Sequence, residues 1–387
     1  MPGWPSAATP AFHRSHSGGP LLNAPARTDD PATSPASAAT PRKARQAGSS
    51  LTRYILVRFL LILPTIFILV TLVFLLMRTT GDPITAALGG RLTADQLAER
   101  VTAAGYDRPL FVQYVEYLGQ IFTGDFGTTL SDNRPVLEVL FVYGAATVEL
   151  AFYALIVAFI VGIPLGMVAA YFRDRTPDAI LRVLAILFYA TPVFFAGLLL
   201  KLLFAVTLKW LPVSGRASTS SELQFALLDE RSGFYLVDAF RTGDAEVVGD
   251  VLQHAVLPGL ALGLLTAGVF LRLVRTNMIG TLGTDYVDAA RSRGVGELRL
   301  VRTHAYRPAL IPIITVIGLQ VAMLLGGAVL TETTFEWKGL GFQLSEYLQA
   351  RDFVAVQGIV VLLAVIVAVT NFLVDIIAAL IDPRVRY

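Results

Sequence analysis

Six long apolar segments occupy most of the chain between residues 54 and 381. A helix needs about 20 mostly apolar residues to cross a bilayer. The composition agrees with a membrane location, because 55% of the 387 residues are hydrophobic, only 16% are charged and the mean hydropathy is +0.63. The sequence therefore predicts an all-α integral membrane protein with six transmembrane helices, at residues 54–78, 145–170, 180–208, 255–276, 309–331 and 354–381.

Charge differs between alternate connections of these segments. The connection 79–141 has eight acidic residues against four arginines, and 331–352 has four against two basic residues. Basic residues gather instead before the first segment, between the second and third, in residues 277–308 and at the C-terminal end. Because cytoplasmic loops are enriched in Lys and Arg, we expect both termini and residues 277–308 to face the cytoplasm, in a multi-pass protein. Residues 81–141 and 209–250 would then be extracytoplasmic.

The N-terminal 50 residues differ from the rest of the chain. They are rich in Pro, Ala, Ser and Thr and contain no apolar run. Such a segment buries too little surface to offset the entropy of ordering it, so we expect a disordered cytoplasmic tail at residues 1–50. No apolar stretch near its start resembles a signal peptide. Residues 51–387 would form the transmembrane domain.

The outer connection 81–141 is patterned for two short helices on or near the membrane surface. In LTADQLAERVTAAG, Thr93 and Gln96 are spaced as a capping box, and Gly105 would end that helix. In PLFVQYVEYLGQIF, Pro109 suits the first turn of a second helix. Their amphipathic pattern is also explained if these short helices only cover the transmembrane helices and have no other role. The connection 209–250 is acidic and mixed, and its pattern assigns it no role.

Residues 277–308, the charged loop, separate the fourth and fifth apolar segments. The stretch TDYVDAARSRGVGELRLVRTHAYRPAL starts at Thr284, which is suited to cap a short helix. Asp285 and Asp288 fall in the first turn of that helix and Arg291 in its last, so their charges complement the helix dipole. Gly294 would permit a turn, and a second helix would run from about Gly296 into the fifth segment.

Two interpretations of the charged loop remain open on physical grounds. Ala289 and Ala290 leave one face of the short helix small, so another backbone can approach closely. A rigid, small-faced helix held out from the membrane suits insertion into a partner's cleft. A solvated basic loop of the ordinary cytoplasmic kind explains the same charges.

Isolated polar residues within or beside the spans are candidates for function. Asp375 is costly in hydrocarbon, yet it lies near the predicted cytoplasmic end, where pairing with an interfacial arginine is expected. Lys201 lies about two helical turns before Trp210, so its amine can extend toward the outer membrane interface. We expect Glu149 at the outer interface, with Trp210 and Trp337 in an aromatic belt. His254 and His304 have no metal-ligand residues near them in the sequence.

Several chemistries are excluded by residues that the chain lacks. It contains no cysteine, which excludes disulfides and thiolate sites. It also contains no HExxH pair and no Walker A loop, so ATP phosphates cannot be held here by a P-loop. Energy for any transport would come from a partner or an ion gradient. No constellation supports a membrane enzyme, and no nucleic acid is expected among the partners.

Motifs along residues 51–387 resemble the dipeptide/oligopeptide permease family of bacterial ABC importers, and most closely its B-type subunit. Asp288-Ala289-Ala290 stands where the EAA loop of ABC-importer permeases has its EAA triplet. Gly294 stands where that pattern has its glycine, after three further residues. The ending of the pattern departs from the general form, since His304, Tyr306 and Arg307 replace its apolar and proline positions, as is common in the peptide branch. The other matching stretches are GDP (81–83), GYDRPLFVQY (105–114), GDFG (124–127), ATVEL (146–150), HAVLPGLALGL (254–264), TETTFEWKGLGFQLSEYLQARDF (331–353) and DPRVRY (382–387).

This resemblance implies a type I ABC-importer permease fold in a bacterial cytoplasmic membrane. The partners it implies are a second permease in a heteromeric complex, two P-loop ATPases that would carry the ATP and Mg, an extracytoplasmic binding protein and a peptide substrate. The charged loop would be the helix that couples to an ATPase, and the residues implied in coupling are Tyr286, Asp288, Ala289, Ala290, Arg291 and Gly294.

Other cargoes and another transporter class stay open at this point. Relatives in the family carry nickel, glutathione or oligosaccharides, and permease sequences reveal the cargo poorly. A gradient-driven secondary transporter would show repeats, broken helices and buried ion ligands near the membrane midplane. The chain shows neither a convincing repeat nor such ligands.

Overall fold

The computed structural model describes residues 48–79 and 81–381, and these are helical almost throughout. The predicted disordered tail (1–50) and the DPRVRY end lie almost entirely outside the described residues. Within the described ranges one isolated antiparallel bridge, between Thr128 and Pro135, is the only β-type pairing. The all-α prediction is therefore confirmed for this part of the chain. The elements in chain order are α1 (Gly48–Thr79), α2 (Pro83–Leu88), α3 (Ala94–Ala103), α4 (Leu110–Thr123), α5 (Val136–Tyr171), α6 (Thr176–Ala190), α7 (Val193–Leu200), the π-helical η1 (Lys201–Thr207), α8 (Thr219–Ala226), α9 (Tyr235–Thr242), α10 (Ala245–Leu282), α11 (Asp285–Ser292), α12 (Glu297–Arg299), the π-helical η2 (Leu300–Ala305), α13 (Tyr306–Phe335), α14 (Leu340–Gln349) and α15 (Phe353–Ile381).

Five of the six predicted spans coincide with single long helices. α1, α5, α10 and α15 contain stretches long and apolar enough to cross a membrane, and α13 covers the predicted fifth span. Prolines lie inside α1, α5 and α10 at Pro64, Pro164 and Pro258. These helices continue through their prolines, as membrane helices often do.

The third predicted span is not one straight helix. α6 ends at Ala190, α7 starts at Val193, and the two helices meet at 104°. Thr191 precedes Pro192 and takes the extended conformation, with φ −78° and ψ 124°. The proline ring disfavours helical geometry at the residue before it and removes a backbone donor, which explains the break. The predicted third span, residues 180–208, is therefore broken into α6 and the pair α7–η1.

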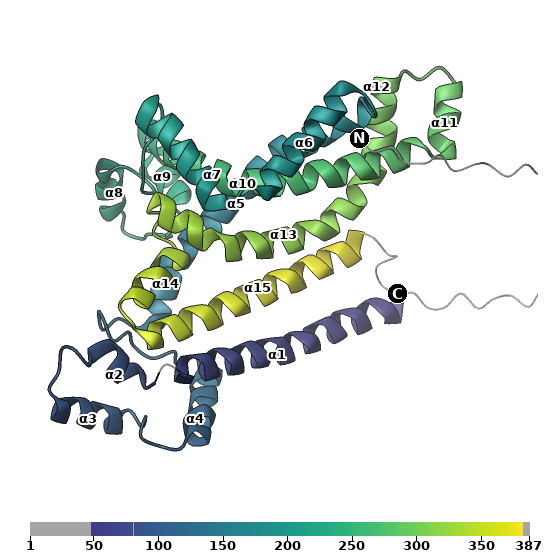
Figure 1. Ribbon diagram of the computed structural model, residues 1–387. Helices are drawn as coiled ribbons and strands as arrows, with labels where there is room; N and C mark the ends of the chain where they lie inside the picture. The colour runs from purple at the N-terminus through teal and green to yellow at the C-terminus, as the bar shows by residue number, and fades with distance from the viewer. Residues whose placement is uncertain (1–47, 80, 382–387) are drawn as a thin grey trace, which may run out of the picture. The chain divides into compact units, whose positions relative to one another are not determined.

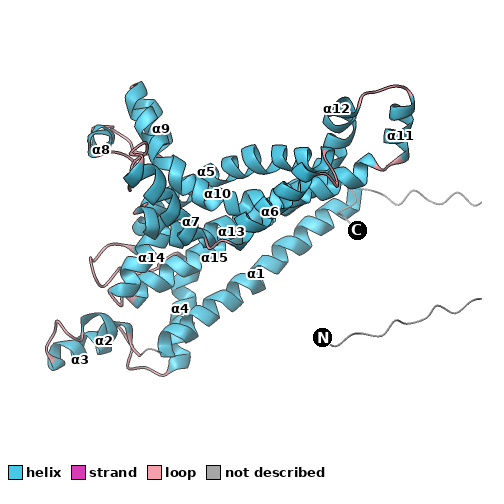
Figure 2. Ribbon diagram, turned by 45° about the horizontal axis from the view of Figure 1, so that its top comes forward, coloured by secondary structure: helices cyan, strands magenta, loops and turns pink. Residues whose placement is uncertain are grey.

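The long helices place the predicted outer and inner connections at opposite ends. Figures 1 and 2 show α11 and α12 at one end, with α2, α3, α8 and α9 at the other. This matches the alternation expected from the charge pattern. The outer connection is shorter than predicted, because α5 begins at Val136, which is fully buried with Val139 against α14 and α15.

Close packing of α5 and α10 forms the centre of the bundle. A Cβ on Gly162 would lie 2.7 Å from the carbonyl oxygen of Ala267, and one on Gly263 would lie 2.6 Å from that of Ala154. Small residues at such positions allow backbones of membrane helices to approach closely. α6 and α13 pack on α10, and α15 packs between α13 and α1. In both views α1 and α15 run side by side.

The first outer connection contains three short helices instead of the two predicted. In α3 both bonds of the Thr93–Gln96 capping box are present, and Gly105 after its end has φ +75°. The additional helix, α2, begins after Asp82, whose side chain accepts a bond from the Thr85 amide at 2.7 Å. Pro109 lies at the N-cap of α4, one position before the expected first turn.

Candidate functional site

The charged loop leaves α10 through a tight turn at Thr284. Thr284 has extended backbone angles at the N-cap of α11, as expected. Its hydroxyl, however, donates to the carbonyl of Thr281 at 2.6 Å and makes no bond to an α11 amide. Thr284 therefore starts α11 through its backbone, and the expected side-chain cap is absent.

Residues of opposite charge lie at the two ends of α11. Asp285 and Asp288 are in its first turn and Arg291 in its last, in agreement with the prediction from the dipole. Val287 is fully buried and anchors the helix against the body of the protein. The rest of α11 is exposed or half-buried, so Val287 is its one fully buried side chain.

Arg291 bridges the two sides of the loop. Its guanidinium donates to both carboxylate oxygens of Glu297, from Nε at 2.6 Å and from Nη2 at 3.3 Å, and it also pairs with Asp288. The hydrogen bond to Arg291 lowers the pKa of Glu297, and the same bond raises the pKa of Arg291. A bidentate arginine–carboxylate pair fixes the relative orientation of the two side chains more strictly than a contact between point charges does. Arg291 therefore ties α11 to α12 across the turn.

Gly294 forms the turn between α11 and α12. Its φ is +82°, and it donates from its amide to the carbonyl of Arg291 at 2.9 Å. The next amide, of Val295, reaches back to Ala290 at 3.3 Å. These bonds and the left-handed residue are typical of a helix end stopped by glycine. The predicted turn at Gly294 is present.

An exposed face of α11 carries the remaining candidate residues. Ala289 is exposed and Ala290 is half-buried. The side chain of Tyr286 is 48% exposed, and its hydroxyl lies 3.4 Å from the carbonyl oxygen of His304. Ala289 is thus accessible to another molecule on this face of α11.

Behind α11, the π-helical η2 connects the loop to two long helices. Leu300, Val301 and Ala305 of η2 are buried, and Val301 and Ala305 pack in one cluster with Phe270 and Met278 of α10. Tyr306 then begins α13 without a break. η2 therefore connects α11 and α12 to both α10 and α13.

The structure corrects two expectations about the outer face. Glu149 is 4% exposed and pairs with buried Arg216 at 2.5 Å, and its carboxylate also accepts from the Leu236 amide at 2.8 Å. It joins α5 to the connection 209–250 and is not an interfacial residue. Trp337 is fully buried, with its indole N–H donating to Ala146 at 2.9 Å, whereas Trp210 is 67% exposed. An aromatic-belt role was therefore wrong for Trp337.

The remaining charged candidates have structural partners. Asp375 pairs with Arg58 of α1 at 3.3 Å, which confirms pairing with an arginine. Lys201 donates to the Thr334 carbonyl at 3.1 Å. His254 contacts Asp250, and no group of three or more His, Cys, Asp or Glu suited to a metal occurs among the residues described.

Comparisons with known proteins decide the family. Residues 162–387 match the family described as "Binding-protein-dependent transport system inner membrane component", and residues 51–155 match the N-terminal family of such membrane components. The chain belongs to this family. Its helices are those of a membrane-embedded component of an ABC importer, which confirms the predicted importer permease and excludes the gradient-driven alternative.

Several relatives of this permease align along most of its length. The di/tripeptide transport system permease protein DppB of Pseudomonas aeruginosa is 37% identical over 84% of this chain and 96% of the relative. The dipeptide transport system permease protein DppB of Escherichia coli is 37% identical over 87% and 99%. The glutathione transport system permease protein GsiC of Salmonella choleraesuis is 34% identical over 86% and 99%. The solved MetNI methionine ABC transporter has a TM-score of 0.47 and 17% identity, over 64% of this chain and 98% of that chain.

Sequence reasoning missed the residues whose partners lie far along the chain. Glu297 was not among the predicted coupling residues, although its spacing from Arg291 across a glycine turn is a usable signal. The buried pair of Glu149 and Arg216 spans 67 positions. No local pattern marks such a pair, because each member reads as an ordinary charge near a helix end.

Proposed function

We propose that this permease forms one half of the membrane pathway of an importer for di- and oligopeptides. Its DppB relatives are named as dipeptide or di/tripeptide permeases, and they align with this chain over nearly their whole length. The other half would be a second, similar permease. A binding protein would deliver peptide to the outer end of the helices, and both termini would face the cytoplasm.

We infer that the exposed face of α11 docks on a cytoplasmic P-loop ATPase. The observation that carries this is the clamped, exposed geometry of α11: the bridge from Arg291 to Glu297 holds it rigid, while Ala289 leaves room for a partner. A lever must move as one body to transmit force. Tyr286, Asp288 and Ala290 complete the proposed docking face, and Gly294 sets its angle.

Purification of the intact complex with variants in α11 tests this docking. Ala289→Asp places a carboxylate on the exposed face without a clash inside the chain, and we expect it to reduce the co-purified ATPase at least several-fold. Ala98→Asp is the matched control, because Ala98 is also an exposed helical alanine, in α3 at the opposite end. Equal recovery of ATPase with both variants would contradict docking through α11.

Glutathione is a second candidate cargo. The observation in its favour is the 34% identity to GsiC over 99% of that relative. Competition of glutathione and of dialanine against uptake of a labelled dipeptide separates the two cargoes. Inhibition by dialanine alone supports the dipeptide assignment, and inhibition by glutathione alone supports the second candidate.

A further inference from the structure

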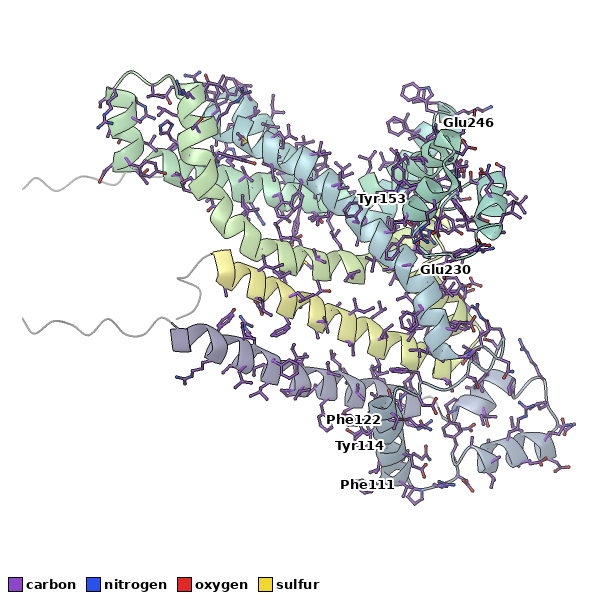
Figure 3. The ribbon with its side chains drawn as sticks, turned by 180° about the vertical axis from the view of Figure 1, so that it is seen from behind. Phe111, Tyr114, Phe122, Tyr153, Glu230 and Glu246 are labelled. Atoms are coloured by element: carbon purple, nitrogen blue, oxygen red, sulfur yellow. The ribbon has the colours of Figure 1, made fainter. Side chains whose placement is uncertain are left out.

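A groove of about 430 Å³ lies between α6 and α10, toward the end of α10 that leads into the charged loop. Figure 1 shows α6 beside α10, and Figure 3 labels Glu246 at the far end of α10 from this groove. We call it the arginine groove; the side chains used below are Arg182, Ile186, Tyr189, Val269, Arg272 and Arg275. Ligand-binding clefts usually measure about 300–1,000 Å³, so the groove is large enough for a ligand.

The arginine groove is basic at one end and apolar at the other. Asp178 near the start of α6 contacts Arg275 near the end of α10, so the two helices run antiparallel. The arginines therefore lie toward the charged loop, while Ile186, Tyr189 and Val269 lie farther from it on the same helices. Ile186 is 66% exposed and Tyr189 is 61% exposed, so this wall is open to a molecule outside the chain.

Positive charge exceeds negative charge at the basic end. Asp178 is fully buried, and its carboxylate accepts from Nε and Nη2 of Arg275 at 2.5 and 2.8 Å. Nε of Arg182 lies 3.7 Å from the same carboxylate, and the Arg182 side chain is 53% exposed. Arg272 is exposed, its side chain forms no hydrogen bond or ion pair with any described residue, and its guanidinium lies 5.8 Å from the centre of the Tyr189 ring. The three lining arginines and the one carboxylate they contact therefore leave a net charge of +2, with Arg182 and Arg272 accessible.

Arg272 lies within a membrane-spanning helix and not in a loop. It comes ten residues before Leu282, the last residue of α10, which is about 15 Å along the helix axis. Basic residues on the cytoplasmic side usually lie in the connections, and one inside an apolar helix is costly unless its charge is neutralised or reaches the interface. The Arg272 side chain can extend its guanidinium to the level of the lipid headgroups while its aliphatic part stays among apolar neighbours. A negatively charged group at that level would complete it.

We propose that the arginine groove binds one phospholipid whose headgroup carries a net negative charge. Arg182 and Arg272 would bind the phosphate, and an acyl chain would lie along Ile186 and Val269. Basic pockets between membrane helices on the cytoplasmic side are suited to anionic headgroups. The net charge of +2 favours an anionic headgroup over a zwitterionic one, and the apolar end of the groove favours a lipid over a free phosphate. The site depends on the membrane location of this chain and not on its cargo, so it goes beyond the proposed function.

Native mass spectrometry of the purified importer complex in a neutral detergent tests the proposal. The probes are dioleoylphosphatidylglycerol, which is anionic, and dioleoylphosphatidylcholine, which has the same acyl chains and no net charge. We expect the native complex to hold phosphatidylglycerol at least several-fold more often than phosphatidylcholine. Arg272→Gln and Arg182→Gln should each lower the phosphatidylglycerol occupancy several-fold, because bonds to charged groups are the strong ones. Arg173→Gln is the matched control, since Arg173 is an exposed arginine just before α6 but outside the lining, and it should retain the native occupancy.

A nitroxide label tests which environment the groove faces. The chain has no cysteine and Ile186 is exposed, so Ile186→Cys provides one labelling site in this chain without a buried change. A label beside lipid should collide with dissolved oxygen more often than with a water-soluble nickel chelate.

Three results would overturn the proposal. The first is equal occupancy by the two lipids, or native occupancy in both arginine variants. The second is preferential collision with the nickel chelate, because the groove would then face an aqueous peptide path. The third is protection of the label from both reagents, which would indicate that a second permease covers the groove.

Discussion

Gly294 and Gly296 in the charged loop differ mainly in the sign of φ. Both have open space where a Cβ would be, but φ is +82° at Gly294 and −67° at Gly296. A side chain in the left-handed region costs about 1–2 kcal/mol, and a β-branched one resists it most. We therefore expect Gly294→Val to lower peptide uptake several-fold and Gly296→Val to leave it near normal, as measured with a labelled dipeptide in cells.

Gly294→Asn provides the complementary test, because asparagine tolerates positive φ better than other residues. It should retain more uptake than Gly294→Val. If all three variants transport alike, the turn angle at Gly294 has no part in coupling.

Glu297 is a second residue with a measurable signature. Its pKa is lowered chiefly by the hydrogen bond from Arg291, from an ordinary value of 4.5. A carboxyl with a lowered folded pKa stabilises the fold fully above its unfolded pKa, and the stabilisation is lost as the pH falls through the folded pKa. The infrared carboxylate signal of Glu297, taken as the difference between native and Glu297→Gln complexes, should titrate with a midpoint below pH 4.5 because its pKa is lowered. In the Arg291→Gln complex the midpoint of this signal should return toward 4.5. An unchanged midpoint in Arg291→Gln would show that the bridge does not form in the complex.

At the scale of whole helices, the contact of α5 with α10 depends on glycines. A Cβ on Gly166 would lie 2.7 Å from that of Val274 and 2.8 Å from the carbonyl oxygen of Leu271. Overpacking of this kind costs about 1–3 kcal/mol, so Gly166→Ala should lower the thermal unfolding temperature of the purified complex. Gly280→Ala on exposed α10 surface is the control, since it meets no atom within 4 Å and should stabilise the helix slightly.

Elements set by local chemistry were predictable from the sequence. The capping box of α3 and the glycine turn after α11 depend on residues within a few positions of one another, and both are present. The break at Pro192 was also encoded locally, but an apolar run of 180–208 masked it. A proline inside a span sometimes bends a helix and sometimes breaks it, and packing decides which.

At the scale of the whole molecule, hydropathy and charge were sufficient for the order of the spans but not for the contacts between them. The burial of Trp337 against Tyr153 joins residues 184 positions apart, at 6.3 Å between ring centroids. The proposed docking face of α11 could be named as a candidate from the sequence because its residues are contiguous. The cavity lined by Arg78, Gln113 and Gln357 could not be predicted, since these residues come from three separate helices.

Thr147 of α5 contacts both α13 and α14 at the outer ends of these helices. A last prediction concerns this contact. The Thr147 hydroxyl donates to Glu332 of α13 at 2.7 Å and accepts from the Leu340 amide of α14 at 2.8 Å. α13 joins this point to η2 and the charged loop, so loosening it should disconnect the outer face from α11, the proposed coupling helix. Thr147→Val keeps the shape but removes one bond to buried Glu332, which retains the Phe342 amide at 2.9 Å, and it leaves the Leu340 amide without a partner, at about 1–3 kcal/mol for that amide. We expect it to lower uptake several-fold while ATPase subunits still co-purify, with Thr147→Ser transporting normally. Loss of ATPase recovery in Thr147→Val would instead mean that this joint is needed for assembly.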